Sequence, residues 1–443
     1  MKNTVSFNEN YPDITKSNEL YERASAGLMH PVSQTLAKGP TQFTNGVAPK
    51  YLSHAKGARV WDVDGNEYLD YNSGIGPISL GYAYEAVDNA IIEQLRKGIT
   101  FSLMHELELH VCELLREVLP NAESVRISKS GADVCTAAVR IARAFTGRNK
   151  VVCCGYHGWH DWYIGTTTRD KGIPESTKAM TTKFAYNDIE SVKAALDEDT
   201  ACLIMEPFVF DAPENNFLED VQTLCKANGT LLIFDEMWTG FRIAVGGAQE
   251  YFGVTPDLAV YSKAVANGMP VAYLTGRADV MELFEEEVFF FTTFGGEALS
   301  LAATIATINE LRDKNVPAHL ARIGRMLKDG YNNIAKELGM DQITGCKGFE
   351  CRTMVTFDPA GGDPMIQKTF VQQEMIKRGI LWGGFHNVCY SHTEADVEYT
   401  LKAYRDVLPL LKSAIEAGNL EDQLRGEPLQ VVFRKVDFRK VEQ

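Results

Sequence analysis

Two residues with reactive side chains stand at the ends of short apolar runs. Lys263 follows Leu258-Ala-Val-Tyr-Ser, and Asp235 ends Leu231-Leu-Ile-Phe-Asp. An amine at the end of a buried strand can attack a carbonyl group as a nucleophile. Burying a carboxylate without a partner is costly, so Asp235 indicates an N–H or cationic partner. The two residues together indicate covalent chemistry on a carbonyl compound that also carries a basic nitrogen.

A third apolar run leads into an expected anion site. Ser130-Gly131-Ala132 follows Ser124-Val-Arg-Ile-Ser-Lys and opens an amphipathic helical segment. The free N–H groups and the dipole of a helix N-terminus both favour phosphate. The alternative is an ordinary strand-to-helix turn with a serine N-cap.

Two more runs end in residues that suit a flat, polar ligand. Gly155-Tyr156-His157-Gly158 follows Lys150-Val-Val-Cys-Cys, and Glu206 follows Ala201-Cys-Leu-Ile-Met. Tyr156 can stack on a ring with His157 beside it, although an aromatic plug in a loop fits equally well. Glu206 can bond to a ligand or serve as a structural partner for a neighbouring group.

These residues need a scaffold that brings strand ends together. From about residue 80 to 300, short apolar runs alternate with amphipathic helical segments, which is typical of an α/β fold with a mostly parallel sheet. Ligands of such sheets lie outside the carboxyl ends of the strands. The expected strands are 124–127, 150–154, 201–205, 231–234, 258–261 and 271–274.

The order of these strand-end residues favours pyridoxal 5'-phosphate as the cofactor. Lys263 would form a Schiff base with its aldehyde, and Asp235 would keep its ring nitrogen protonated as an electron sink. Met237, on the same face of the chain as Asp235, could pack under the ring. A lone strand-end lysine is usually a surface residue, but the whole set in this order outweighs that alternative.

The flanking regions predict a second, smaller folding unit. We expect an N-terminal segment 1–80 that contributes to a small domain and cleft, a large cofactor-binding domain 81–310, and a C-terminal α+β domain 311–443. Within them the patterns predict a helix over 13–28, an irregular surface segment over 29–57, a hairpin over 59–71, a helix pair over 302–340, an α+β unit over 343–415 and a β-like tail over 428–443.

Composition excludes several classes of function. The net charge of −15 leaves no basic excess for nucleic acid or an anionic membrane. No run of 18 apolar residues and no apolar signal region occur, so neither a membrane span nor secretion is expected. The nine scattered cysteines indicate reduced thiols in the cytoplasm. Cys346 and Cys351 lack a second pair, so we expect no metal site.

The chain resembles the class III aminotransferases of fold type I, especially the glutamate-1-semialdehyde aminomutase branch, over about residues 40–415. The stretches that carry the resemblance are Trp61–Tyr71, Tyr156-His-Gly, Asp235–Arg242, Gly247–Leu258 and Gly268-Met-Pro. It implies a large domain with a mostly parallel seven-stranded sheet, and a small α+β domain formed by the two chain ends. It also implies a homodimer with shared active sites.

The resemblance also implies roles for individual residues. Lys263 would be the Schiff-base lysine and proton shuttle, with Tyr156 and Met237 on the two faces of the cofactor ring. Thr293 would reach the phosphate of the neighbouring subunit. The implied catalytic residues are Lys263 and Asp235, and the cofactor-binding residues are Ser130, Gly131, Ala132, Tyr156, His157, Asp235, Met237, Lys263 and Thr293.

One departure from the aminomutases concerns the substrate. Their N-terminal loop carries an arginine that grips the substrate carboxylate, but no arginine occurs here between Arg23 and Arg59. Losing a bidentate charge-assisted clamp costs roughly 1.5–3 kcal/mol of affinity, unless Lys38 or Arg169 replaces it. Neutral polar side chains offer hydrogen bonds instead, which suits a hydroxylated ring. The candidate substrate residues are Glu206, Gln42 and Trp162.

The main hypothesis is a ping-pong transaminase. It would move an amino group from an amino acid, with L-glutamate expected, to a keto- or aldehydo-sugar, an aminocyclitol or an aminoglycoside precursor. The alternative is a glutamate-1-semialdehyde 2,1-aminomutase-type isomerase of tetrapyrrole synthesis, which needs no external donor. A cofactor-binding regulator without turnover is a third possibility.

Overall fold

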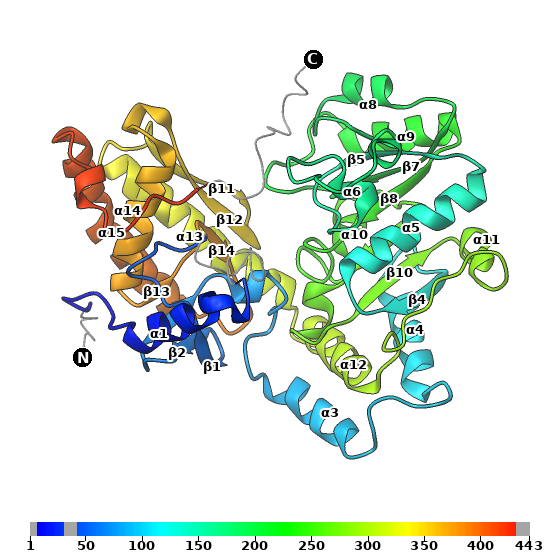
Figure 1. Ribbon diagram of the computed structural model, residues 1–443, viewed down its shortest axis with the longest axis horizontal. Coiled ribbons are helices and arrows are strands. Elements are labelled where there is room, and N and C mark those ends of the chain that lie inside the picture. The colour runs from blue at the N-terminus through cyan, green and yellow to red at the C-terminus, as the bar shows by residue number, and fades with distance from the viewer. Residues whose placement is uncertain (1–6, 31–41, 431–443) are drawn as a thin grey trace. The chain divides into compact units, whose positions relative to one another are not determined.

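The structure is a computed structural model that describes residues 7–30 and 42–430 of the chain (Figure 1). The described residues divide into two compact units. The larger unit is Glu85–Pro317, and the smaller combines the described parts of Met1–Tyr84 and Ala318–Val432. The domain boundaries expected at residues 80 and 310 stay a prediction.

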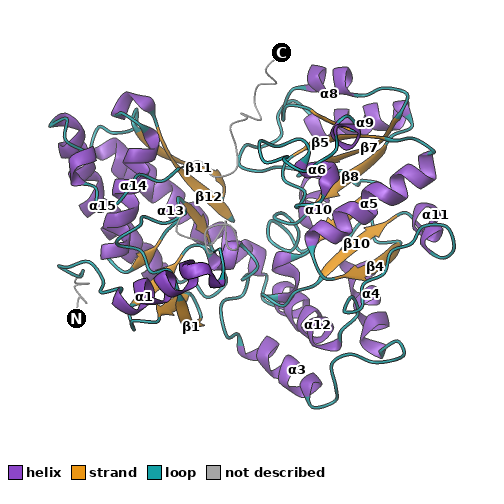
Figure 2. Ribbon diagram, in the orientation of Figure 1, coloured by secondary structure: helices purple, strands orange, loops and turns teal. Residues whose placement is uncertain are grey.

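A seven-stranded sheet forms the centre of the larger unit, with strand order β4-β10-β9-β8-β7-β5-β6 (Figure 2). β10 runs antiparallel to the other six strands of this sheet, which all point the same way. The strands are β4 (Ser124–Ser128), β5 (Lys150–Cys154), β6 (Thr181–Lys183), β7 (Thr200–Met205), β8 (Leu231–Asp235), β9 (Leu258–Tyr261) and β10 (Ala272–Gly276). Every residue of β7, β8 and β9 is buried, as expected for continuous apolar strands covered on both faces.

All six strands expected in this region are confirmed, and β6 is an addition. The helices of the unit are α3 (Glu85–Leu95), α4 (Glu106–Val118), α5 (Gly131–Thr146), α6 (Asp161–Ile164), α7 (Glu175–Lys178), α8 (Ile189–Ala195), α9 (Phe217–Asn228), α10 (Gly247–Phe252), α11 (Ala278–Met281) and α12 (Ala298–Asp313), with 3-10 turns η3 (Lys263–Ala266) and η4 (Glu282–Phe284).

Two small sheets organise the smaller unit. One has the order β1-β2-β3-β13 and the other β11-β12-β14. Their strands are β1 (Leu52–Lys56), β2 (Arg59–Asp62), β3 (Glu67–Asp70), β11 (Thr344–Phe349), β12 (Arg352–Phe357), β13 (Ile380–Leu381) and β14 (Phe385–Asn387). Because β13 pairs in parallel with β3, segments near the two chain ends share one sheet.

Helices complete the smaller unit. They are α1 (Thr15–Arg23), the π-turn η1 (Ala24–Leu28), α13 (Val316–Glu337, from Ala318 onward), α14 (Pro364–Lys377) and α15 (Glu394–Glu416), with 3-10 turns η2 (Ser73–Ile75), η5 (Pro359–Gly361) and η6 (Glu421–Gln423). The helix expected over 13–28 and the helix pair expected over 302–340 are therefore confirmed. The expected β-like tail lies outside the described residues from 431 onward.

The hairpin expected over 59–71 is confirmed, and one neighbouring expectation is wrong. β2 and β3 pair antiparallel, and the Asp62 carboxylate closes their turn by accepting the N–H of Asp64 and of Asn66 at 3.0 and 2.8 Å. Residues 52–56, expected to be irregular, form β1, because the edge of β2 supplies backbone partners that the local sequence does not reveal. No helix among the described residues is long and apolar enough to cross a membrane.

Candidate active site

The carboxyl ends of four neighbouring strands meet along one edge of the large sheet. In the β8–β9 pair, Asp235 lies opposite Val260, which places Lys263 just beyond the end of β9. In the β5–β7 pair, Cys154 lies opposite Met205, so the residues after both strands emerge side by side. The predicted site residues that follow β9, β8, β7 and β5 therefore share one edge.

The Asp235 side chain has no exposed surface, and its partners are donors. His157 Nδ1 lies 2.8 Å from Asp235 Oδ2, and the backbone N–H of Met237 donates to Oδ1 at 3.1 Å. The second ring nitrogen of His157 lies 3.2 Å from the Cys154 carbonyl oxygen, which fixes the orientation of the imidazole. Sequence reasoning placed His157 beside the cofactor but missed its bond to Asp235, because His157 lies in the loop after β5 and Asp235 ends β8, 78 positions away in sequence.

Lys263 starts the 3-10 turn η3 with a φ of +44°, a left-handed conformation that costs a non-glycine residue energy. Its Nζ lies 4.0 Å from the centroid of the Trp238 ring, within cation–π range. The guanidinium carbon of Arg242 lies 5.6 Å from the same ring. Sequence reasoning missed Trp238 as a neighbour of Lys263, although it stands in the stretch after Asp235.

The turn after β4 has the donor geometry of an anion site. The Ser130 hydroxyl accepts the N–H of Asp133 at 3.3 Å, and the Asp133 carboxylate accepts the N–H of Ser130 at 3.1 Å. This capping box opens α5, a helix of 16 residues. The N–H groups of Gly131 and Ala132 lie in its first turn, where a helix provides no carbonyl partner. They are available to an anion, as phosphate binding requires.

The loop after β5 is held against this turn. The N–H of Tyr156 donates to Glu206 Oε1 at 2.8 Å, while the Tyr156 ring is 42% exposed. Burial and the negative charge of Asp235 raise the pKa of Tyr156. Gly158 has a φ of +99°, and a Cβ there would lie 2.7 Å from the Ala132 Cβ. The aromatic loop and the start of α5 are thus in direct contact.

Met237 and Gly131 approach each other in the same way. A Cβ on Gly131 would lie 2.9 Å from the Met237 sulfur, so only a glycine leaves room for that side chain. The Met237 thioether thus packs against the first turn of α5, while its backbone N–H is bonded to Asp235.

The remaining predicted residues lie in different settings. Thr293 is exposed on the segment before α12. Trp162 is buried, and its Nε1 donates to Thr136 Oγ1 at 2.9 Å. Gln42 belongs to the smaller unit, where its carbonyl accepts from Gln372 Nε2 at 3.0 Å. For Glu206 and Trp162 these contacts favour supporting roles, and their predicted substrate contacts stay predictions.

Comparison with known proteins gives the family that the sequence resembles. The model of the family "Aminotransferase class-III" matches residues 43–394. The chain belongs to the class III aminotransferases. It is 35% identical over 416 residues to the 3-aminobutyryl-CoA aminotransferase of Cloacimonas acidaminovorans, covering 91% of this chain and 99% of that protein. It is also 35% identical over 429 residues to the glutamate-1-semialdehyde 2,1-aminomutase of Methanococcoides burtonii, covering 88% and 98%.

The fold of this class III aminotransferase also matches solved structures. It aligns with the pyridoxal phosphate internal aldimine form of the FumI protein of Sphingopyxis sp. MTA144 with a TM-score of 0.83. The identity is 25%, and the alignment covers 91% of this chain and 98% of that one. The chain is therefore a pyridoxal-phosphate-dependent transaminase of fold type I, with a mostly parallel seven-stranded sheet and a small α+β unit from both chain ends.

The residues of the sheet edge fit this cofactor. A buried carboxylate suits a ring N–H, a helix N-terminus suits a phosphate, and an amine at a strand end suits an aldehyde. Glycines at 131 and 158 let Met237 and the loop after β5 pack closely against the start of α5.

The contact between Gly158 and Ala132 yields a prediction. We expect Gly158→Ala to raise the half-saturating concentration of pyridoxal phosphate at least about tenfold. The added methyl group would push the loop after β5 away from Ala132, and a displacement of about 1 Å in a functional site can cost up to about 100-fold. The measurement is a titration of the apoenzyme with cofactor, followed by absorbance.

A matched control separates displacement of the loop from backbone strain. Gly172 has a nearly equal φ of +97°, but a Cβ there would meet no atom within 4 Å. Gly172→Ala should leave cofactor affinity unchanged. An equal loss in both variants would contradict the interpretation.

Proposed function

We propose that this enzyme transfers an amino group by a ping-pong mechanism from L-glutamate to a carbonyl compound. A keto- or aldehydo-sugar, an aminocyclitol or an aminoglycoside precursor is the proposed acceptor class. The observation that carries this choice of acceptor is the absence of arginine between Arg23 and Arg59, in a segment whose two glutamines and three threonines offer neutral hydrogen bonds instead. We further propose that the enzyme works in the cytoplasm, which its nine free cysteines support.

Lys263 and Asp235 are the proposed catalytic residues. Bound pyridoxal phosphate supplies an electron sink that weakens the C–H bond beside the substrate nitrogen. Lys263 Nζ would hold the cofactor covalently and, when released, accept and return the proton at the substrate carbon. Asp235 would hold a proton on the ring nitrogen. The 2.8 Å contact with His157 supports this role, because it fixes one carboxylate oxygen in place.

The other residues of the edge would bind and orient the cofactor. Ser130, Gly131 and Ala132 are proposed to hold its phosphate, and the start of a long helix supports this. Tyr156 and Met237 are proposed to cover the two faces of its ring. Trp238 is proposed to keep the Lys263 amine near the substrate carbon through the 4.0 Å contact with its ring.

The named relatives favour two further candidate reactions. One relative is a 3-aminobutyryl-CoA aminotransferase, so a 3-oxoacyl thioester is the second candidate acceptor. A thioester likewise lacks the carboxylate that the missing arginine would bind. The other is a 2,1-aminomutase, which keeps an isomerase as the alternative activity.

We propose that two copies of the chain pair through the segments around the start of α12. The Ile99 carbonyl accepts the N–H of Ala298 at 2.8 Å, so residues 99–109 adjoin residues 289–297. Both segments expose large apolar side chains, which soluble monomers rarely do in such number. The exposed residues are Ile99, Phe101, Leu103, Met104, Leu109, Phe289, Phe291 and Phe294. Thr293 lies among them, as its proposed reach into the neighbouring subunit requires.

The first prediction of this proposal concerns Lys263. We expect Lys263→Ala to lose at least about a thousandfold in turnover, because both the covalent anchor and the proton carrier are removed. Cofactor binding should persist, since the phosphate and ring contacts remain. Turnover by stopped assay and cofactor content by absorbance check this. Activity retained in Lys263→Ala would exclude the assignment.

The second prediction concerns the donor and the reaction type. With stoichiometric enzyme, L-glutamate should yield one 2-oxoglutarate per site and convert the cofactor to its pyridoxamine form. The pyridoxamine form is then offered keto- and aldehydo-sugars, a 3-oxobutyryl thioester and 2-oxoglutarate as acceptors. Failure to release any 2-oxoglutarate would favour the aminomutase instead. Transfer to the thioester but not to sugars would select the second candidate.

The third prediction concerns the homodimer. Leu103→Glu and Met104→Glu together should shift the protein from dimer to monomer, because each places a charge on the proposed apolar contact. Analytical ultracentrifugation measures this, with Tyr251→Glu as a control at an exposed large side chain outside these two segments. A monomeric parent protein would exclude the proposal.

A further inference from the structure

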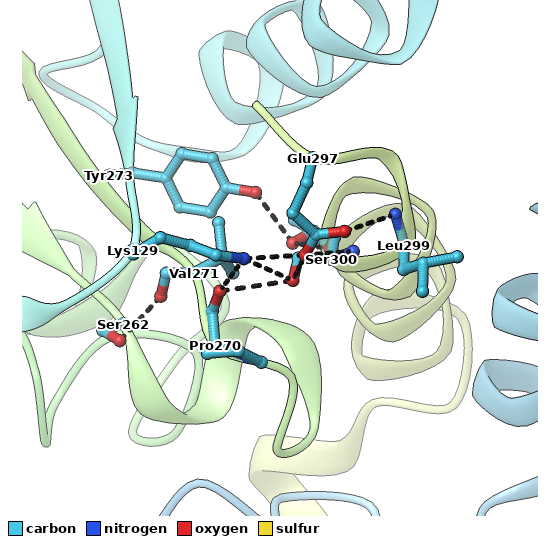
Figure 3. A network of polar contacts seen from close by, with 9 residues as sticks. Lys129, Ser262, Pro270, Val271, Tyr273, Glu297, Leu299 and Ser300 are labelled. Atoms are coloured by element: carbon cyan, nitrogen blue, oxygen red, sulfur yellow. Dashed lines mark hydrogen bonds and ion pairs between the residues drawn. The ribbon is translucent and has the colours of Figure 1, made fainter. Parts of the chain in front are cut away.

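Lys129 joins three segments that the proposed cofactor site needs. It stands between the end of β4 and Ser130, the N-cap of α5. Its ammonium group donates to Glu297 Oε1 and to the Pro270 carbonyl, both at 2.7 Å, and to Ser300 Oγ at 3.2 Å (Figure 3). One side chain therefore links the proposed phosphate turn to two other segments.

The contact with Pro270 ties Lys129 to the loop that carries Lys263. This loop leaves β9 after Tyr261 and returns into β10 at Ala272. Ser262 Oγ donates to the Val271 carbonyl at 2.7 Å, which closes the base of the loop (Figure 3). Pro270 lies within this loop, next to Val271. Its bond to Lys129 therefore fixes the distance between the loop that carries Lys263 and the proposed phosphate turn.

The contact with Glu297 ties Lys129 to the start of α12. Glu297 is the N-cap of this helix and accepts the N–H groups of Leu299 and Ser300 at 2.9 and 3.1 Å. Its side chain is 8% exposed and that of Lys129 is 25% exposed, so the ion pair is largely shielded from water. Unlike a surface pair, a shielded pair with further hydrogen bonds holds its geometry and is costly to break.

Glu297 also closes the segment that carries Thr293. Its N–H donates to the Phe294 carbonyl at 3.2 Å, and the N–H of Gly295 donates to the Thr292 carbonyl at 3.1 Å. The position of this turn thus depends on where α12 begins. Ser300 adds a second link, since its Oγ also donates to the Pro270 carbonyl at 3.2 Å.

We propose that Lys129 is a positioning residue of the transaminase, which sets the distance from the Lys263 amine to the phosphate turn and the Thr293 segment. The inference rests on the proposed function of these segments. Lys129 does not touch the cofactor in this role. It acts through Ser130, Pro270 and Glu297, because a cofactor held at both its phosphate and its aldehyde tolerates little change in that distance.

The test uses Lys129→Met, which keeps the aliphatic length but removes the charge and all three donors. We expect the half-saturating concentration of pyridoxal phosphate to rise about tenfold in the apoenzyme titration, the effect of losing one charge-assisted hydrogen bond. The rate constant of the glutamate half-reaction should fall by a similar factor with little change in KM for glutamate. A purely structural role would not produce that split.

Lys150→Met serves as the matched control. Lys150 also forms an ion pair, with Asp197 at 2.5 Å, but lies at the amino end of β5, on the opposite edge of the sheet. It should lower the thermal midpoint of the apoenzyme by at most a few degrees and leave cofactor affinity unchanged. Lys129→Arg should recover part of the affinity, because the guanidinium keeps the charge but not the compact donor geometry.

Two results would overturn the proposal. One is wild-type cofactor affinity and half-reaction rate in Lys129→Met. The other is a loss of affinity no greater than that of Lys150→Met. If Lys129→Met does not fold, Ser300→Ala replaces it, with an expected loss of about threefold from one weaker hydrogen bond. Wild-type affinity in Ser300→Ala would then overturn the proposal.

Failure of the proposed function is recognised separately. Borohydride reduction of the wild-type enzyme, followed by mass spectrometry, should find the cofactor fixed on the Lys263 peptide. If it does not, the site assignment fails together with the inference. If it does and Lys129→Met behaves as wild type, only the role of Lys129 fails.

Discussion

A carboxylate without exposed surface at the end of β8 is the constraint on which the rest of the site depends. Water cannot solvate Asp235, so donors must surround it. His157 and the N–H of Met237 meet part of that requirement. They come from different parts of the chain, so satisfying one carboxylate brings the loop after β5 and the turn after β8 together. The same requirement leaves the group ready for a protonated ring nitrogen.

The buried acid next to Asp235 has a different task. Glu236 accepts the N–H groups of Ala248 and Gln249 at 2.9 and 3.1 Å and so anchors the start of α10. Burial raises its pKa to about 7 despite these bonds. Two neighbouring carboxylates thus point to opposite sides of the β8 end, one toward the site and one toward the scaffold. The two carboxylates are separated because successive side chains of an extended strand point to opposite faces of the sheet.

The elements around the site were largely predictable from the sequence. Continuous apolar runs predicted β7, β8 and β9, because strands buried on both faces need no polar residues. β6 was missed because Thr181–Lys183 has no apolar residue and lies at the edge of the sheet. β1 was missed because it also lies at the edge of its sheet. Edge strands are held by backbone pairing with a neighbouring strand, and a pattern of apolar side chains does not reveal that pairing.

The sequence indicated which residues belong to the site better than it indicated the contacts between them. The order of Lys263, Asp235, Ser130 and Tyr156 along the chain indicated one site. The bonds between His157 and Asp235, or between Lys129 and Pro270, join residues more than 70 positions apart. Such pairs follow from strand order and register, which periodicity does not encode. Lys129 in particular has the appearance of a surface residue when only its neighbours in sequence are considered.

The capping box at the start of α5 divides the donors of one helical turn between two tasks. The N–H groups of Ser130 and Asp133 are satisfied within the protein, and those of Gly131 and Ala132 are left for a ligand. The capping box thus holds the first turn of α5 by contacts within the protein. A phosphate bound here as proposed would meet donors that these contacts already hold in place, so little of its binding energy would be lost to ordering the chain.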